Sequence, residues 1–276
     1  MRFLTITLAA AAAAYGAESV TPPVEVILGK IAESQEAGRE ARQRIVYSQL
    51  VHAKLLRTNG QLAREEKRTY TVTPTAKSFG RTLEKFEGWY ERRGKMIPYG
   101  EPDFHYKGMD IDGELINDLI NDWTGNQGSR DGVDRDLFPL TAAHQQKYTF
   151  RATAPFRLAF EPRRTDGGQS SPWKGEITVD PETLHPRTMN STFAYKIPMA
   201  VKIIFGISLR QLGYAVTYDK TIDDLWFPIS AGTEFSLRVL FGYARTMTLS
   251  MKNYDFRRAA AESTVEFAPA REEERQ

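Results

Sequence analysis

Hydrophobic and polar residues alternate along the last third of the chain, as they do in strands that bury one face. In the segment 233–241, Phe235 and Leu237 alternate with Glu234 and Ser236. The same alternation recurs in the segments 156–160, 175–180, 189–195, 214–218 and 243–251. Consecutive alternating segments joined by short polar turns predict an antiparallel meander with one buried face and one face in water.

The segment 21–42 has a different period. Val24, Ile27 and Ile31 recur at helical spacing and form one apolar stripe, while charged residues occupy much of the remaining surface. Thr21 stands where a helix cap is expected, and the two prolines after it suit a first helical turn. The pattern predicts an amphipathic helix whose stripe needs a partner surface.

Two strand-like segments, 45–56 and 61–72, follow this helix and are joined by an Asn-Gly sequence, which is typical of a β-hairpin turn. In the second segment, Arg64, Glu66 and Arg68 share their parity with apolar residues. Charged side chains on such a face predict either a well-solvated section or a strand at the edge of the sheet.

The middle of the chain, 92–146, is less regular. The segment 113–123 carries a short helical stripe of leucine and isoleucine, and the segment 125–136 is a polar, glycine-rich loop. Thr141 is placed to cap a single turn of helix. Together with the first helix and the strands, these features predict an α+β fold that is mostly antiparallel β-sheet.

The start of the chain reads as a secretory signal peptide, with one basic residue, a short apolar run and small residues before a polar one. A retained membrane anchor is the alternative, although a spanning helix needs roughly 20 apolar residues. No linker or fixed-period repeat divides the remainder. The predicted organisation is a signal peptide at 1–17, a single domain at 18–258 and a mobile tail at 259–276.

Composition and charge exclude several classes of function. The net charge of +2 gives no large positive field, so nucleic acid is not an expected partner. The absence of cysteine removes disulfides, thiolate nucleophiles and Cys-ligated metal sites. An exported chain without cysteine suits the periplasm of a bacterial envelope better than a disulfide-rich extracellular setting.

Motifs that carry chemistry are scarce. The four histidines have no metal-binding spacing, so neither a metal nor another cofactor is expected. Ser171 and Lys174 have the spacing of some serine acyl enzymes, but their segment leads into a strand rather than a helix. A hydrolase with an unrecognised site stays as an alternative, with His105, Asp110 and Asp112 as its candidate residues. A second acidic grouping, in a loop that we expect to be solvated, comprises Asp131, Asp134 and Asp136.

Large apolar side chains gather on one strand face of the last third. They form either an ordinary core under the helices or the lining of an apolar cavity that sheet and helices do not fully close. Methionine adapts to chains of variable shape, which suits such a lining. The candidate lining residues are Phe156, Phe160, Phe193, Phe235, Leu237, Met247, Leu249 and Met251.

The order of these features resembles the LolA-like superfamily of periplasmic carriers, which sort outer-membrane lipoproteins. The resemblance is carried by the signal peptide, the first helix, the Asn-Gly hairpin and two strand segments, 173–183 and 225–235. It implies an incomplete (half) β-barrel with helices covering the open concave side, in which acyl chains are shielded from water. The long middle section, 92–146, departs from the shorter carriers.

We therefore expect a non-catalytic periplasmic protein that binds an apolar ligand, either a lipid or the acyl chain of a lipoprotein. Each methylene removed from water contributes about 0.8 kcal/mol to such binding. Contact with membranes would be transient only. The alternative is a cell-envelope interaction module with an ordinary packed core, whose apolar segment 198–205 would bind a protein partner.

Overall fold

The computed structural model describes residues 21–75, 79–106, 108–124, 140–165, 168–169, 173–194, 208–238 and 243–259. The predicted signal peptide at 1–17, the acidic grouping at 131–136 and the apolar segment at 198–205 lie outside these ranges. All but the first residue of the predicted tail also lies outside them.

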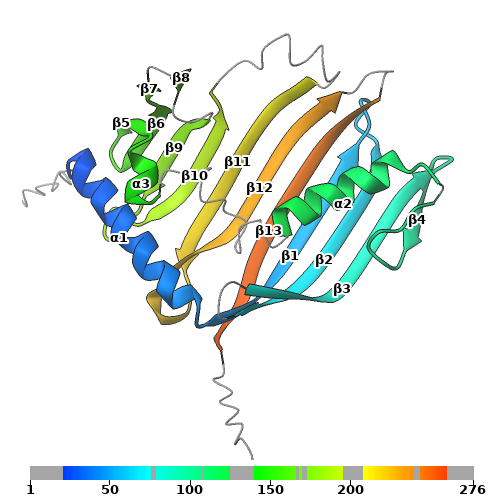
Figure 1. Cartoon of the computed structure of the whole chain (residues 1–276), viewed down its shortest axis with the longest axis horizontal. Helices are drawn as coiled ribbons and strands as arrows, with labels where there is room; N and C mark the ends of the chain where they lie inside the picture. The colour runs from blue at the N-terminus through cyan, green and yellow to red at the C-terminus, as the bar shows by residue number, and fades with distance from the viewer. Residues whose placement is uncertain are drawn as a thin grey trace, which may run out of the picture.

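Helices and strands follow one another as drawn in Figure 1. The helices are α1 (Val24–Arg42), α2 (Ile111–Thr124), α3 (Ala142–Gln145) and a 3-10 turn (Ile222–Asp224). The strands are β1 (Ile45–Leu56), β2 (Leu62–Pro74), β3 (Phe79–Arg92), β4 (Lys95–Tyr99), β5 (Tyr148–Ala154), β6 (Arg157–Pro162), β7 (Arg164–Thr165), β8 (Gly168–Gln169), β9 (Trp173–Val179), β10 (Pro186–Phe193), β11 (Ser208–Lys220), β12 (Trp226–Arg238) and β13 (Ala244–Arg258). Within the described ranges, no helix has both the length and the apolar character needed to span a membrane.

Eleven strands form one antiparallel sheet in the order β4-β3-β2-β1-β13-β12-β11-β10-β9-β6-β5, and β7 pairs with β8 separately. Because β4 and β5 stand at opposite edges, the sheet is open (Figure 1). The prediction of a mostly antiparallel fold is confirmed, whereas a half-barrel closed over by helices stays a prediction. β1 lies beside β13, so an early strand and the last one meet in the middle of the sheet.

β1 and β2 form the hairpin that the Asn-Gly sequence predicts, and Gly60 in its turn has φ +80°. β2 is not at an edge, because it pairs with β1 on one side and with β3 on the other. Its charged residues Arg64, Glu66 and Arg68 are buried. The expectation of a solvated or edge strand is therefore wrong, because these charges are neutralised by one another and by residues far away in the sequence.

One row of cross-strand partners runs across the whole sheet and shows which residues share a face. Directly paired residues of antiparallel strands point to the same side, as Tyr214, Thr233 and Leu249 do here. From β5 to β4 the row consists of Phe150, Phe160, Gly175, Ser191, Tyr214, Thr233, Leu249, Ala53, Glu66, Gly88 and Tyr99. A Cβ atom at Gly175 would overlap the backbone carbonyl oxygen of Asn190 on the neighbouring strand and lie 2.8 Å from Cζ of Phe160, so this position needs glycine.

Both long helices pack on the side of the sheet to which this row points. α2 places Ile116 and Ile120 among apolar residues of β1 and β13. α1 places Ile27 and Ile31 among apolar residues of β6 and β9–β12. Trp123, in the last turn of α2, packs against both groups. We call this side the helix-bearing face.

The helix predicted at 21–42 is present as α1, but its first turn differs from the expectation. Pro23 occupies the N-cap position, and no side chain caps the helix, so the predicted role of Thr21 is wrong. The helix starts directly after the two prolines, whose fixed φ suits its beginning. The short helix predicted at 113–123 is confirmed as α2. The cap at Thr141 is also confirmed, because its hydroxyl oxygen accepts from the backbone N–H of His144 at 3.2 Å.

Asp180 holds the turn between β9 and β10. Its carboxylate accepts from the backbone N–H groups of Glu182 (3.0 Å) and Thr183 (2.9 Å), from the Thr183 hydroxyl (2.9 Å) and from Arg187 (2.9 Å). Burial alone would raise the pKa of Asp180, but hydrogen bonds from Thr183, Arg187 and Glu182 outweigh it and lower the pKa to about 2. The turn predicted after β9 is thus fixed by an ionised carboxylate.

We predict that Asp180→Asn flattens the pH dependence of the free energy of unfolding below about pH 5. Because the pKa of this carboxyl is lower in the folded state than its unfolded value of about 3.9, its contribution is present above that value. It is lost as the pH falls toward the folded-state pKa of about 2. Urea unfolding at a series of pH values measures the slope, with Asp118→Asn, an exposed carboxylate of α2, as control. An Asp180→Asn protein with the wild-type slope would contradict the assignment.

Candidate functional site

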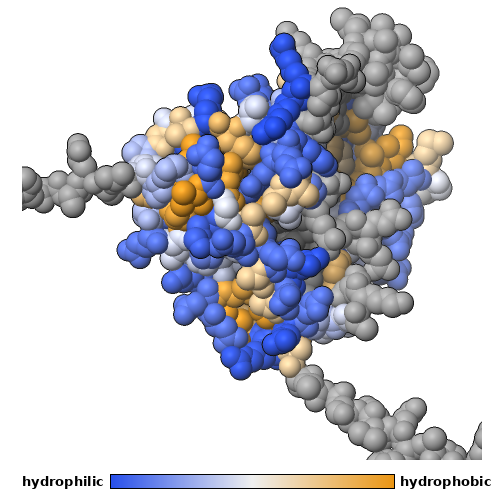
Figure 2. Space-filling view, turned by 60° about the vertical axis from the view of Figure 1, so that its left-hand side comes forward, coloured by the Kyte–Doolittle hydropathy of each residue, from blue (hydrophilic) through white to orange (hydrophobic). Residues whose placement is uncertain are grey.

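The helix-bearing face is apolar across most of its width. Beneath α2, the buried residues of β1, β2 and β13 are Val51, Ala53, Leu55, Ala63, Met247, Leu249 and Met251. Beneath α1, the buried group includes Tyr148, Leu158, Phe160, Ile177, Val179, Met189, Val216, Tyr218, Trp226 and Ala231. Seen with the α1 side forward, hydrophobic side chains reach the surface in several separate places among hydrophilic ones (Figure 2).

Five of the eight predicted lining residues lie together beneath α2. Met247, Leu249 and Met251 are buried there. Phe235 and Leu237, on the neighbouring strand β12, are partly exposed and pack against this group. The alternation on β12 and β13 thus predicts correctly which side chains share a face.

The other three predicted lining residues lie farther along the sheet. Phe160 is buried in the group beneath α1, and Phe156 is partly buried against it. Phe193 is partly exposed, with its ring centroid 5.2 Å from that of Trp173 in an edge-to-face contact. The eight residues therefore fall into separate groups on one sheet, and their role as a ligand lining stays a prediction.

Aromatic side chains connect the two apolar groups. The ring of Tyr214 on β11 stacks on Trp123 of α2 at 5.6 Å and meets Trp173 of β9 edge to face at 5.0 Å. Tyr214 and Trp123 are both partly exposed, as are Phe235 and Leu237 on β12. We call these four residues, Trp123, Tyr214, Phe235 and Leu237, the aromatic patch; each of them keeps part of its surface open to water.

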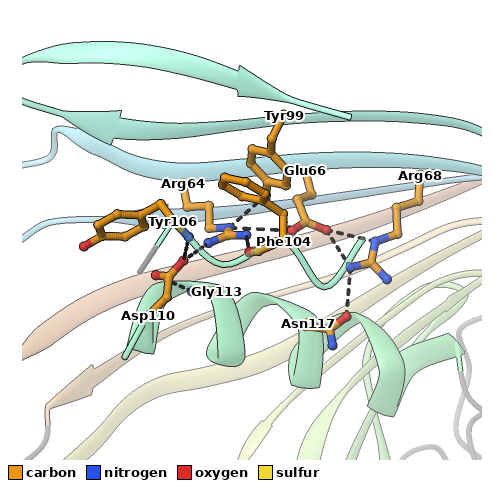
Figure 3. A network of polar contacts seen from close by, with 9 residues as sticks. All are labelled: Arg64, Glu66, Arg68, Tyr99, Phe104, Tyr106, Asp110, Gly113 and Asn117. Atoms are coloured by element: carbon orange, nitrogen blue, oxygen red, sulfur yellow. Dashed lines mark hydrogen bonds and ion pairs between the residues drawn. The ribbon is translucent and has the colours of Figure 1, made fainter. Parts of the chain in front are cut away.

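A buried network of charges lies on the β2 side of the same face, beside α2 (Figure 3). Arg64 donates to the hydroxyl oxygen of Tyr99 at 2.8 Å, to Oδ2 of Asp110 at 2.7 Å and to the carbonyl oxygen of Phe104 at 2.6 Å. This one guanidinium group therefore joins β2, β4 and the loop that precedes α2.

Glu66, which is 0 % exposed, links Arg64 to a second arginine. Its carboxylate accepts from the Tyr99 hydroxyl at 2.6 Å and from Arg68 at 2.6 and 2.9 Å. Arg68 also donates to Oδ1 of Asn117 on α2 at 3.0 Å. Two arginines thus balance the carboxylates of Glu66 and Asp110, and the network adds no net charge to the face.

The network also fixes the protonation states of its members. Burial, reinforced by the charge of Glu66 and the hydrogen bond to it, raises the pKa of Tyr99 far above its ordinary value. Burial alone would lower the pKa of Arg68, but Glu66 outweighs burial and holds the pKa above its ordinary value. At neutral pH, Tyr99 is therefore a neutral donor and Arg68 a cation.

A second ion pair holds the first turn of α2 on the other side of β1. Asp112 accepts from Nε of Arg245 at 2.8 Å and from its Nη2 at 2.9 Å, and it also accepts from the hydroxyl of Tyr243. Burial and the bond to Asp112 raise the pKa of Tyr243. Because Asp110 binds β2 and Asp112 binds β13, the start of α2 is fastened to both strands that flank β1.

The residues that could support hydrolysis are not arranged for it. Asp110 and Asp112 are each bonded to an arginine, and His105 is exposed, so the three do not converge in a cleft. Within the described ranges, no group of three or more His, Asp or Glu side chains could hold a metal ion.

Of the charge network, the site residues predicted from sequence contain only Asp110, as a candidate of the alternative hydrolase site; its partners are not among them, although a signal for them exists. Arg64, Glu66 and Arg68 stand at every second position of one strand, so they share a face with apolar residues, and their charges alternate between positive and negative. Charges in this order can neutralise one another when they are buried. Asp110 comes just before the apolar stripe of α2, and nothing in the neighbouring sequence indicates that it binds a distant arginine.

No protein-family model matches the chain, and no curated protein matches it. Among solved structures, lipovitellin, in a study of its lipid–protein interactions, is 10 % identical with a TM-score of 0.40; the match covers 80 % of this chain and 26 % of lipovitellin. A DUF1329 family protein from Desulfovibrio piger is 12 % identical with a TM-score of 0.33, covering 88 % and 96 %. The chain spans about a quarter of the length of lipovitellin. Neither likeness is high enough to establish a shared fold, and the resemblance to LolA-like carriers stays a prediction.

We predict that Glu66→Ala lowers the free energy of unfolding by about 3–5 kcal/mol, because it leaves the buried Arg68 without its carboxylate partner and the Tyr99 hydroxyl without its acceptor. Glu87→Ala, on the adjacent strand β3, removes an ion pair with Lys85 at the surface and should change stability little. Urea unfolding of both variants measures the difference. Equal effects would show that the buried network contributes no more than a surface pair.

Proposed function

We propose that the protein is a non-catalytic carrier or binding protein for an apolar ligand, either a lipid or the acyl chain of a lipoprotein. The ligand would lie on the helix-bearing face, with the sheet acting as an incomplete barrel and α1 and α2 as partial covers. The proposal follows from the alternating apolar strands, which predict a face that an apolar ligand can cover.

The aromatic patch is the observation that supports the proposal most. Met247 and Leu249 of β13 are buried beneath α2, but Phe235 and Leu237 of the adjacent strand remain partly exposed. Apolar side chains that continue the buried core and stay partly exposed suit a ligand that completes the packing.

Hydrophobic burial supplies enough free energy for such a carrier. Ten methylenes removed from water would contribute about 8 kcal/mol, from which the loss of ligand freedom must be subtracted. The net affinity would then be moderate, which suits a protein that must also release its cargo. The signal peptide predicted from sequence supports a periplasmic location as part of the proposal; there, lipids in transit would need shielding and contact with membranes would be brief.

A protein-interaction module is the second candidate, and one observation favours it. Met109, just before α2, is 71 % exposed, and its neighbours Tyr106 and Ile111 are exposed as well. Exposed apolar residues grouped in this way often mark a surface that binds a partner. Cross-linking in cell envelopes would identify such a partner, and loss of the cross-link in Met109→Lys would place it at the start of α2.

We predict that the protein purified without detergent carries lipid, and that the double variant Phe235→Gln, Leu237→Gln carries at least about tenfold less. Each substitution removes apolar surface from the aromatic patch, at a cost of more than 1 kcal/mol in ligand binding. Mass spectrometry of extracted lipids measures the lipid bound per protein.

Leu50→Gln is the matched control, because Leu50 is a partly exposed leucine on the opposite face of β1. It should leave the bound lipid unchanged. Wild-type protein that contains no lipid and takes up no added palmitic acid would reject the carrier function. Equal loss in the control would instead show that the aromatic patch has no special part in binding.

A further inference from the structure

Two hydroxyl groups on the helix-bearing face are buried without a hydrogen-bond partner. Ser191 is 1 % exposed and Thr233 is 7 % exposed. Within the part of the chain that the structure describes, neither Oγ of Ser191 nor Oγ1 of Thr233 has a donor or acceptor in reach. Since buried polar atoms are paired in the large majority of cases, two orphans on one face call for a partner that the described residues do not supply.

Both hydroxyl groups belong to the cross-strand row that spans the sheet. Ser191 on β10 and Thr233 on β12 are the two direct partners of Tyr214 on β11. The next residue of the row is Leu249, which packs beneath α2. The hydroxyl groups therefore point to the helix-bearing side, one on each side of Tyr214.

Their surroundings are aromatic and apolar. The ring of Tyr214 between them is held by Trp123 at 5.6 Å and by Trp173 at 5.0 Å. Phe235 is the next residue after Thr233 on the same face of β12, so the Thr233 hydroxyl group lies beneath the aromatic patch, and Ser191 lies on the other side of Tyr214. An unpaired hydroxyl group that is buried in such surroundings is costly.

We propose that the ligand is an acyl lipid with carbonyl oxygen atoms, and that Ser191 and Thr233 donate hydrogen bonds to these oxygens. The inference rests on the proposed function and names the class of its ligand: an acyl ester or a fatty acid, and not a bare hydrocarbon. A carbonyl oxygen that meets either hydroxyl group recovers the free energy lost by leaving it unpaired.

The spacing of the two groups distinguishes lipids with one and with two ester groups. Ser191 and Thr233 are separated by two strand spacings, about 10 Å between their backbones. With Tyr214 between them, a single carboxyl group reaches one of them only. A diacyl glycerophospholipid carries two ester carbonyls and can engage both.

The test measures the Kd of three probes for the full mature chain by displacement of a fluorescent fatty acid. The probes are dipalmitoyl phosphatidylglycerol, palmitic acid and hexadecane. Ser191→Ala and Thr233→Val should each weaken the phospholipid about three- to tenfold, the value of one neutral hydrogen bond. Palmitic acid should respond to one of the two variants, and hexadecane to neither. Thr233→Ser keeps the hydroxyl group and should stay within about twofold of wild type for all probes.

A second measurement needs no ligand. If the Thr233 hydroxyl group is unpaired in the lipid-free protein, Thr233→Val should raise the Tm by about 2 °C or more. A lower Tm would show that water or another group already satisfies the hydroxyl and would overturn the inference.

The outcomes separate this inference from the function on which it rests. Suppose that the probes bind, and that the hydroxyl variants change the Kd of hexadecane and of the phospholipid equally. This result would support the carrier function and reject hydrogen bonding by Ser191 and Thr233. A wild-type protein that binds none of the three probes would reject both.

Discussion

An open sheet of eleven strands has to bury one face without closing on itself, and this requirement governs the arrangement of the remaining elements. The period of two along each strand puts apolar side chains on one side, and α1 and α2 pack on that side. α1 does so mainly by apolar contact. α2 combines apolar contact with ion pairs to β2 and β13, which fix where it lies. Between the residues that these helices bury, the aromatic patch stays partly exposed.

The late strands could be predicted from sequence because their pattern is local. Alternation such as that of Phe235 and Leu237 needs no knowledge of distant residues, and the observed pairing keeps both on the helix-bearing face. The position of β2 could not be predicted in this way. Arg64 is neutralised by Asp110, 46 residues later, and oriented by Tyr99, 35 residues later. Without those partners, a run of alternating charges is indistinguishable from a solvated strand.

The candidate site shows the same division between local and distant information. Sequence alternation identifies Met247, Leu249 and Phe235 as neighbours on one face, but it does not reveal how much of that face a helix covers. The stripe of α2 predicts a helix without predicting that Ile116 and Ile120 rest on β1 and β13. The orphan hydroxyl groups of Ser191 and Thr233 carry no sequence signal, because serine and threonine are ordinary strand residues until their burial and pairing are known.

The pairing of β1 with β13 constrains how the chain reaches its folded state. β13 joins β4–β1 on one side to β12–β5 on the other, so the two halves become a continuous sheet only after the last strand has been inserted. Contacts between such distant segments are slow to form, because a long loop must close before they are gained. Until then, both halves expose unpaired central strands and are at risk of pairing with other chains. The species that lacks only its last strand would therefore be the one most prone to aggregate.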